Sequence, residues 1–342
     1  MTKKILIVRS SSLGDLIFVL PAISDIAKHF PGITIDWVVE KTFAEIPSWH
    51  PAVHQVIPIS HRRWRKNWWS SESRRERAAF RKKLRQTKYD MVLDMQALMK
   101  SVWVVRQAIG ERHGLDWKSA RERLASLFYH KRHRVEFWQP AVTRQRELAA
   151  LALGYRYEGA PDFGLQAFTD GVEIQNYAVV MPSASRDDKL WPEEDWHAAL
   201  DLLVEHGLEL RVLAGNAKEA ERAAELVKKY PHVQFLTALP LKEVAHQLAA
   251  ARLMIGLDSG LTHLSAALGR PTIGIYCAST PVRTPLTGAG MTASLGDRGV
   301  PPSRDLVILK LKQALGVSID GATDESAAEQ AQDETLAVSR SE

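Results

Sequence analysis

Cysteine is nearly absent from this sequence of 342 residues, and long apolar runs are missing altogether. The single cysteine, Cys277, excludes a disulfide within the chain, so nothing in the sequence requires an oxidising compartment. The apolar run Ile5–Val8 ends at Arg9, which makes it too short for a signal peptide. No stretch reaches the ~20 apolar residues that cross a bilayer. We therefore expect a soluble, cytoplasmic protein.

Several motifs that carry chemistry in other proteins are also missing. No G-x-G-x-x-G follows the first apolar run, which argues against a dinucleotide cofactor there. His130 and His133 have no cysteine or histidine partners at zinc spacing. Neither a P-loop nor a nucleophile elbow occurs. We predict no cofactor and no metal site.

What the sequence does contain is an alternation of short apolar runs and longer helical patterns. Hydrophobic residues make up 45% of the chain and charged residues 25%, as in ordinary globular proteins. The alternation is typical of βαβ units, and continuous Val, Ile and Leu runs suit parallel strands buried on both faces. The predicted fold class is therefore α/β. The predicted strands are Lys4–Arg9, Thr34–Val39, His54–Ile59, Met91–Asp94, Tyr177–Met181, Glu209–Ala214, Val233–Leu236, Arg252–Leu257 and Thr272–Tyr276.

Proline and serine mark the starts of several predicted helices. Pro192 lies in the first turn of one helix. Ser303 can cap a last helix that runs to about Leu315. Pro21 interrupts the helical pattern that begins at Asp15, which predicts a kink or a delayed helix start.

The chain is long enough for two domains of ordinary size. Glycine and proline in the segment 161–175 predict a linker between two α/β domains, residues 1–160 and residues 176–316. The segment 317–342 is rich in Asp, Glu, Ala, Ser and Gln, which predicts a disordered tail.

The loop after the first strand, Ser10–Asp15, is the first candidate site. In open parallel sheets ligands bind beyond the carboxyl ends of the strands, so this loop faces the ligand. Gly14 lets a ligand approach the backbone closely. Asp15 is then either a general base or a carboxylate that merely complements the helix dipole. Taken alone, the residues favour the second interpretation.

The segment Asp258–His263 has the same layout, because it follows a strand and opens a helix. Free N–H groups and the dipole at a helix N-terminus bind phosphate, and Gly260 leaves room for it. The alternative is a capped helix that binds nothing. Since the layout occurs once in each half of the chain, phosphate binding is favoured.

Two charged segments complete the candidates. Lys189, in the segment Ser183–Pro192, can neutralise charge on a departing diphosphate. The arginines of His61–Trp69 can bind carboxylate or phosphate bidentately. Its three tryptophans suit a sugar face, a membrane interface or nucleic-acid bases. A solvated basic loop is the alternative, and the residues leave this choice open.

Seven segments, taken in order, resemble the lipopolysaccharide heptosyltransferases of glycosyltransferase family 9. They are SSSLGD (10–15), DWVVE (36–40), IPSWHPAV (46–53), RRWRK (62–66), LASLFY (124–129), RDDKLWPEEDW (186–196) and DSGLTH (258–263). The resemblance implies a GT-B fold, in which two Rossmann-like domains face each other across a cleft. It also implies transfer of L-glycero-D-manno-heptose from ADP-heptose to a Kdo sugar of the lipid A–Kdo inner core, with inversion and without a required metal.

Residue by residue, the resemblance implies a site divided between the domains. Asp15 would deprotonate the acceptor hydroxyl, and Lys189 would contact the donor around its diphosphate and heptose. The other donor-binding residues would be Ser185, Glu219, Asp258, Ser259, Gly260, Leu261, Thr262 and His263. The acceptor-binding residues would be Ser12, Gly14, Arg62, Arg63, Arg65, Lys66 and Arg121, the cations holding carboxylates and phosphates.

Other interpretations differ in the partner of the basic segment. RRWRK favours a Kdo acceptor over the other core acceptors of heptosyltransferase II and III types. A lipid-linked anionic acceptor implies peripheral contact with the inner face of the cytoplasmic membrane, for which Trp64, Trp68 and Trp69 are the predicted residues. A nucleic-acid-binding protein that uses the basic block 61–88 is a different class of function. It leaves both helix starts unexplained, so no nucleic-acid partner is predicted.

Overall fold

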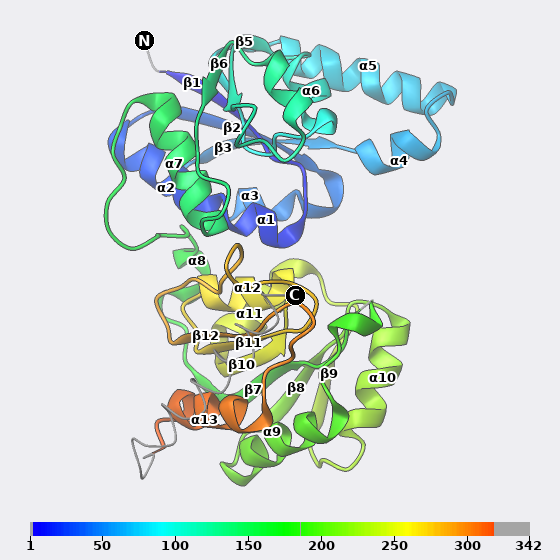
Figure 1. Ribbon diagram of the computed structural model, residues 1–342. Coiled ribbons are helices and arrows are strands. Elements are labelled where there is room, and N and C mark those ends of the chain that lie inside the picture. Colours follow the sequence, from blue (N-terminus) through cyan, green and yellow to red (C-terminus); the bar gives the residue numbers. More distant parts are fainter. Residues whose placement is uncertain (1–2, 185, 318–342) are drawn as a thin grey trace. The chain divides into compact units, whose positions relative to one another are not determined.

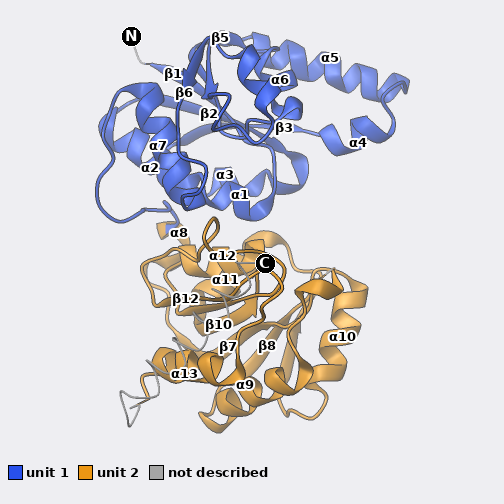
Figure 2. Ribbon diagram, in the orientation of Figure 1, with its two compact units in different colours: residues 1–165 blue, residues 166–342 orange. Residues whose placement is uncertain are grey.

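The computed structural model describes residues 3–184 and 186–317, and the chain divides into two compact units, residues 1–165 and 166–342 (Figures 1 and 2). The boundary lies inside the segment 161–175. The short helix α8 (Gln166–Thr169) belongs to the second unit, where Phe168 is buried and its ring lies 4.8 Å from that of His246. Except for Val317, the segment predicted to be a disordered tail lies outside the described residues.

Unit 1 is built on a fully parallel, six-stranded sheet with the order β3-β2-β1-β4-β5-β6. Its strand order reverses between β1 and β4, the switch point at which open α/β sheets bind ligands. The strands are β1 (Lys4–Val8), β2 (Thr34–Glu40), β3 (Val53–Ile59), β4 (Lys88–Asp94), β5 (Ile109–Leu115) and β6 (Lys131–His133).

Helices cover both faces of this sheet (Figure 1). On one face α4, α5 and α6 bury a cluster that includes Trp64 and Phe80. On the other face α2 and α7 lie side by side, joined by a buried ion pair between Asp25 and Arg146 at 2.7 Å.

The predicted delay of the helix start at Pro21 is confirmed, since α1 ends before Pro21 and α2 is a separate helix that begins at Leu20. The helices are α1 (Leu13–Ile17), α2 (Leu20–His29), α3 (Glu45–Ser48), α4 (His61–Lys66), α5 (Ser71–Arg85), α6 (Met99–Val105) and α7 (Ala141–Leu153), with 3-10 helices at η1 (Lys41–Phe43) and η2 (Arg123–Phe128).

Unit 2 repeats the same strand order in a second parallel sheet, β12-β11-β10-β7-β8-β9. Its switch point lies between β7 and β10. The strands are β7 (Gln175–Met181), β8 (Glu209–Leu213), β9 (Val233–Leu236), β10 (Ala251–Leu257), β11 (Thr272–Tyr276) and β12 (Thr292–Gly296). The helices are α8, η3 (Asp187–Lys189), α9 (Glu193–Glu205), α10 (Ala217–Val227), α11 (Leu241–Ala250), α12 (Gly260–Ala267) and α13 (Arg304–Leu315).

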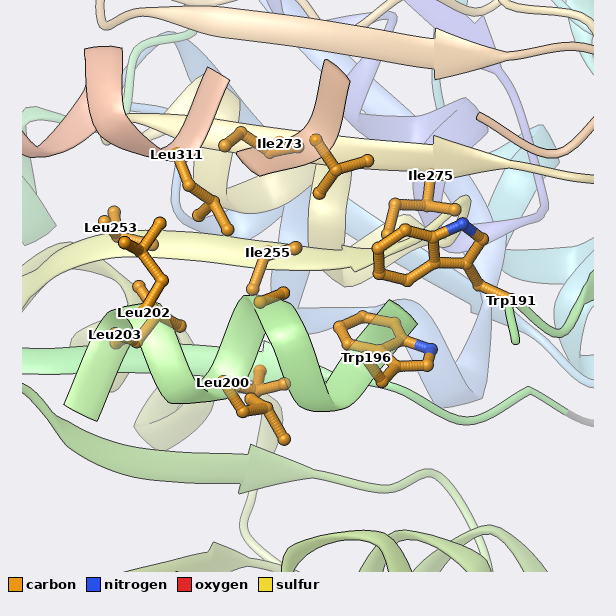
Figure 3. Close-up of a cluster of buried hydrophobic side chains, with 14 of the residues drawn as sticks. Trp191, Trp196, Leu200, Leu202, Leu203, Leu253, Ile255, Ile273, Ile275 and Leu311 are labelled. Carbon is orange, nitrogen blue, oxygen red and sulfur yellow. The ribbon is translucent and has the colours of Figure 1, made fainter. Parts of the chain in front are cut away.

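The main core of unit 2 lies between its sheet and helices α9 and α13 (Figure 3). Trp196 and Leu200 of α9 and Leu311 of α13 point toward the sheet. They belong to one buried cluster with Ile255 of β10 and Ile273 of β11. The spacing of these apolar residues at three and four positions gives each helix one face that must be buried. This packing fixes the strands whose carboxyl ends carry the site.

The ends of α13 follow the predicted pattern. The Ser303 hydroxyl accepts a hydrogen bond from the backbone N–H of Leu306, and Gly316 ends the helix with a φ of +73°. A positive φ is readily adopted by glycine, which explains the stop.

All nine predicted strands are present. β9 and β11 have the predicted ends, and the others differ at an end by one to three residues. Three strands were not predicted: β5, β6 and β12. β5 was missed because it contains glycine at a position where an apolar side chain would be expected. At Gly114 an added Cβ would lie 2.4 Å from the ring of Tyr129, so only glycine fits.

None of the helices within residues 3–184 and 186–317 has the length and hydrophobicity of a membrane-spanning helix.

Candidate active site

The site of unit 1 lies at the carboxyl ends of β1 and β4. The loop Arg9–Ser12 leaves β1, and Ser12 is the N-cap of α1. Gln96, two residues after β4, holds this loop. Its Oε1 accepts hydrogen bonds from Ser10 N (3.1 Å) and Ser10 Oγ (2.8 Å), and its Nε2 donates to Ser11 O (3.0 Å). Because a buried side chain satisfies these backbone groups, the loop has one defined shape.

Asp15 lies in the first turn of α1 with its carboxylate fixed from two sides. Oδ1 is 2.5 Å from Arg9 Nη2, and Oδ2 accepts hydrogen bonds from Ser12 N (2.8 Å) and Ser12 Oγ (3.0 Å). Burial alone would raise the pKa of Asp15, but the Arg9 charge and the Ser12 hydrogen bonds outweigh it and lower the pKa below its usual value. The side chain is 39% exposed. Asp15 therefore both caps α1 and presents an ionised carboxylate at the switch point.

Two further charged residues, which the sequence analysis did not single out, act on this site. Lys100 is the second residue of α6 and donates from Nζ to Ser11 Oγ at 2.8 Å. Glu40 ends β2 and accepts a hydrogen bond from Arg62 N at 3.2 Å, while its burial raises the pKa of the carboxyl group. Both residues follow or end strands that pair with β1, and this long-range pairing brings them to the site.

The RRWRK segment forms most of α4, and the structure separates the roles of its residues. Arg63 makes ion pairs with Glu72 (2.9 Å) and Glu76, so its charge is already partly neutralised. Trp64 is only 3% exposed, packs against Phe80 and donates from Nε1 to Glu76 Oε2 at 2.7 Å. The prediction that Trp64 contacts a membrane is therefore wrong, because this position of α4 faces the core. The other predicted acceptor-binding cations, Arg62, Arg65, Lys66 and Arg121, are exposed, and Gly14 is buried within α1.

The site of unit 2 lies at the carboxyl ends of β7 and β10, where α12 begins. The Ser259 hydroxyl is the N-cap and accepts from Thr262 N at 3.2 Å. Thr262 Oγ1 donates to Leu257 O at 2.7 Å, which ties the helix start to β10. We expected the amides of residues 259–262 to hold donor phosphates. Since the cap occupies the Thr262 amide, those of Gly260 and Leu261 remain for a phosphate.

Asp258 lies beside this helix start and is held by three side chains. Its Oδ1 is 3.3 Å from His263 Nε2, and its Oδ2 accepts from Ser279 Oγ at 2.5 Å. Lys189 donates from Nζ to the Asp258 backbone oxygen at 3.1 Å and lies 3.7 Å from Oδ2. Burial would raise the pKa of Asp258, but the hydrogen bonds from His263 and Ser279 and the charge of Lys189 lower it. His263, which we expected to bind the donor, is itself buried against Asp258.

Glu219 lies in the first turn of α10, beyond the carboxyl end of β8. Its Oε2 accepts from Gly215 N at 2.8 Å and its Oε1 from Asn216 Nδ2 at 2.7 Å. The carboxylate thus closes the loop at the strand end and is almost fully buried. Ser185, the remaining predicted donor residue, lies outside the described residues.

The two units therefore share one plan: a parallel sheet of Rossmann strand order, with a loop and a helix start at the switch point. One switch point holds an ionised carboxylate and cations, and the other a helix N-terminus with a lysine, as suits a diphosphate. Two Rossmann-like units with such sites define a glycosyltransferase of the GT-B class.

Comparison with known proteins identifies the family. Residues 77–309 match glycosyltransferase family 9 (heptosyltransferase). Lipopolysaccharide heptosyltransferase 1 of Escherichia coli K12 is 45% identical over 286 residues, covering 81% of this chain and 89% of that protein. E. coli heptosyltransferase WaaC superposes with a TM-score of 0.84 when bound to ADP and 0.80 when bound to ADP-2-deoxy-2-fluoro heptose, at 41% and 42% identity, over 92% of this chain and 99% of that one. The chain belongs to glycosyltransferase family 9, which confirms the resemblance seen in its motifs.

Proposed function

We propose that this chain transfers L-glycero-D-manno-heptose from ADP-heptose to a Kdo sugar of the lipid A–Kdo inner core, with inversion and without a metal. The observation that carries the proposal is the cluster at the β7/β10 switch point, where the start of α12, Asp258 and Lys189 come together. The E. coli structures with ADP and with ADP-2-deoxy-2-fluoro heptose support a donor of this type.

The donor half of the reaction belongs to unit 2. The amides of Gly260 and Leu261, reinforced by the dipole of α12, bind the diphosphate. Lys189 neutralises the negative charge that grows on ADP as the bond to the heptose breaks. Asp258 keeps the lysine ammonium in place and turns its ionised carboxylate toward hydroxyl groups of the heptose.

The acceptor half belongs to unit 1. Asp15 accepts the proton of the attacking hydroxyl, whose oxygen forms the new bond to the anomeric carbon while ADP leaves from the opposite face, so the configuration inverts. The lowered pKa keeps the Asp15 carboxylate ionised and ready to accept a proton at neutral pH. A base of this kind contributes roughly 10²- to 10⁴-fold in rate. The exposed cations of α4 hold the negative groups of the acceptor.

We also propose that α4 and α5 bind the anionic inner face of the cytoplasmic membrane, where a lipid-linked acceptor resides. Trp69 is 81% exposed, and the Arg77 guanidinium lies 3.8 Å from the centre of the Trp68 ring. Only Ser73, Phe80 and Leu84 of α5 are buried. The rest of that helix is dense in arginine and lysine, so it suits a surface of anionic headgroups.

The choice of acceptor tests the proposed reaction. The purified protein would be incubated with ADP-heptose and either Kdo-lipid A or an acceptor that already carries heptose, and the products weighed by mass spectrometry. The proposal expects addition of one heptose to Kdo-lipid A. Addition only to the heptose-bearing acceptor would instead assign the chain to the heptosyltransferase II or III type.

The membrane contact has its own test, co-sedimentation with phosphatidylglycerol vesicles at low salt. Trp69→Ala should weaken sedimentation, whereas Trp138→Ala, a substitution of another exposed tryptophan of unit 1, should not. Equal sedimentation of both variants and the unchanged protein would contradict the role of Trp69.

A further inference from the structure

Lys100 is a cation at the unit 1 switch point to which neither the motifs nor the resemblance assigns a role. It follows β4, which pairs in parallel register with β1 from Ile5 to Val8. Its Nζ donates to Ser11 Oγ at 2.8 Å, and Ser11 is almost fully buried. The ammonium group therefore contacts the loop that runs directly into Asp15.

The electrostatic surroundings of Lys100 contain both signs of charge. Burial and the nearby cations Arg62 and Arg9 lower the pKa of Lys100, against the attraction of the Asp15 and Glu40 carboxylates. Each of these carboxylates already has a partner. Asp15 is bound by Arg9 and Ser12, and Glu40 accepts the backbone N–H of Arg62.

Two cations of this group have no carboxylate of their own. In the part of the chain that the structure describes, neither Lys100 nor Arg62 forms an ion pair, and the Arg62 guanidinium lies 5.6 Å from the centre of the Phe43 ring. Lys100 is partly buried and is repelled by the charge of the exposed Arg62, so an anion that binds beside both cations stabilises them. The pair thus provides an anion site beside the proposed base.

We propose that Lys100, together with Arg62, binds the carboxylate of the acceptor sugar and thereby sets a hydroxyl of the same sugar against Asp15. This inference rests on the proposed function and adds to it the residues that orient the acceptor. Lys100 contacts Ser11, and Asp15 contacts the adjacent Ser12. Because Ser11 and Ser12 are neighbours, an anion bound by Lys100 and a hydroxyl that faces Asp15 suit two groups of one small molecule, as in a sugar acid.

Steady-state kinetics of Lys100→Met and Lys100→Arg test the proposal. Loss of a charge-assisted hydrogen bond should raise KM for Kdo-lipid A about 10- to 100-fold in Lys100→Met, and Lys100→Arg should recover most of this loss. The dissociation constant for ADP-heptose should change less than about twofold in both variants, because the donor binds unit 2. Lys28→Met, an exposed lysine near the end of α2, is the matched control and should leave both constants unchanged. An unaltered acceptor KM in Lys100→Met, with a normal thermal melt, would overturn the proposal.

Direct binding separates this inference from the proposed function. Free Kdo and inorganic phosphate would each be titrated into the unchanged protein and into Lys100→Met by calorimetry. Kdo binding that weakens at least about tenfold in the variant, with little binding of phosphate to either, supports the carboxylate site. Equal Kdo affinity for both proteins, or tighter binding of phosphate than of Kdo, overturns it. These titrations need no turnover, so they decide the role of Lys100 even if no heptose transfer were seen.

Discussion

Arg9 Nη2 lies 2.5 Å from Asp15 Oδ1, so the proposed base of this transferase is held by an arginine six residues before it in the chain. The same guanidinium donates from Nη1 to the backbone oxygen of Met95, just after β4. Arg9 thus joins the two strand ends of the switch point and keeps the carboxylate ionised. Arg9 therefore acts together with the Ser12 hydrogen bonds to position the Asp15 carboxylate and to lower its pKa.

Replacing Arg9 should change the pH dependence of the reaction. Arg9→Gln removes the positive charge that helps to lower the pKa of Asp15, so that pKa should rise. Because the base acts in its ionised form, the acid limb of kcat/KM against pH should move to higher pH by the same amount. Arg134→Gln is the control. It removes an exposed arginine that pairs with Asp116 at 3.9 Å, and it should leave the acid limb of kcat/KM unchanged.

The change in the pKa of Asp15 should also alter the stability of the folded protein at acidic pH. A carboxyl group whose pKa is lowered by folding stabilises the folded state above its unfolded pKa and loses that contribution as the pH falls through the folded pKa. In Arg9→Gln the folded pKa lies closer to the unfolded one. The contribution should therefore be smaller and should be fully lost at a higher pH than in the unchanged protein, as measured by urea unfolding across acidic pH. An unchanged acid limb in the kinetics would show that Asp15 is not the titrating base.

Lys189→Gln should slow the reaction more than it weakens donor binding. If the ammonium stabilises charge that develops on ADP, its loss should lower kcat by about 10²- to 10³-fold. The dissociation constant for ADP-heptose should rise far less, since the amides of Gly260 and Leu261 remain. Lys229→Gln in the same unit, where the lysine pairs with Asp201 on the surface, is the control. A fall in affinity as large as the fall in kcat would instead make Lys189 a simple binding residue.

Two serine caps allow a matched test of the α12 site. Ser259 caps α12 and Ser303 caps α13, each by accepting a backbone N–H three residues ahead. Either serine-to-alanine change should lower the free energy of unfolding by about 1 kcal/mol. Only Ser259→Ala should also weaken ADP binding, because only α12 presents its first amides to the phosphates. Equal ADP affinity in the two variants would argue against phosphate binding at α12.

The buried ion pair of unit 1 should dominate the stability of its α2–α7 face. Arg146 bonds Asp25 with two nitrogens and also donates to the backbone oxygens of Glu158 and Gly159. Asp25→Ala leaves a buried guanidinium without its carboxylate and should cost about 3 to 5 kcal/mol in urea unfolding. Glu225→Ala, which breaks an exposed pair with Lys228, should change stability by less than about 1 kcal/mol. If the two substitutions lowered the free energy of unfolding equally, the buried pair would contribute no more to stability than the exposed pair.

The local sequence pattern was sufficient to predict the strands that are buried on both faces, because their continuous apolar runs are typical of such strands. The edge strands β6 and β12 lack such runs, and β5 carries Gly114 where Tyr129 packs, so their identity depends on neighbours far away in the chain. The positions of Asp15 and Asp258 soon after predicted strands could be read from local pattern, but their proposed roles came from the family resemblance, since the residues alone favoured a helix-dipole role for Asp15.

Other features of the site depend on long-range pairing. Lys100 and Gln96 reach the Ser10–Ser12 loop only because β4 lies beside β1, which no short window of sequence contains. Trp64 looked like part of an exposed aromatic cluster, but the phase of α4 is set by packing against α5. The packing of α4 against α5, and not its composition, therefore decides which residues of this basic helix are buried.

Acceptor-dependent ADP release from ADP-heptose, measured for the unchanged protein and for Asp15→Asn, tests both the proposed reaction and its base. We expect release that requires Kdo-lipid A and falls by about 10²- to 10⁴-fold in the variant, while the affinity of the variant for ADP-heptose is retained. Full activity of Asp15→Asn would contradict the assignment of the base, and the absence of release by the unchanged protein would contradict the proposed reaction.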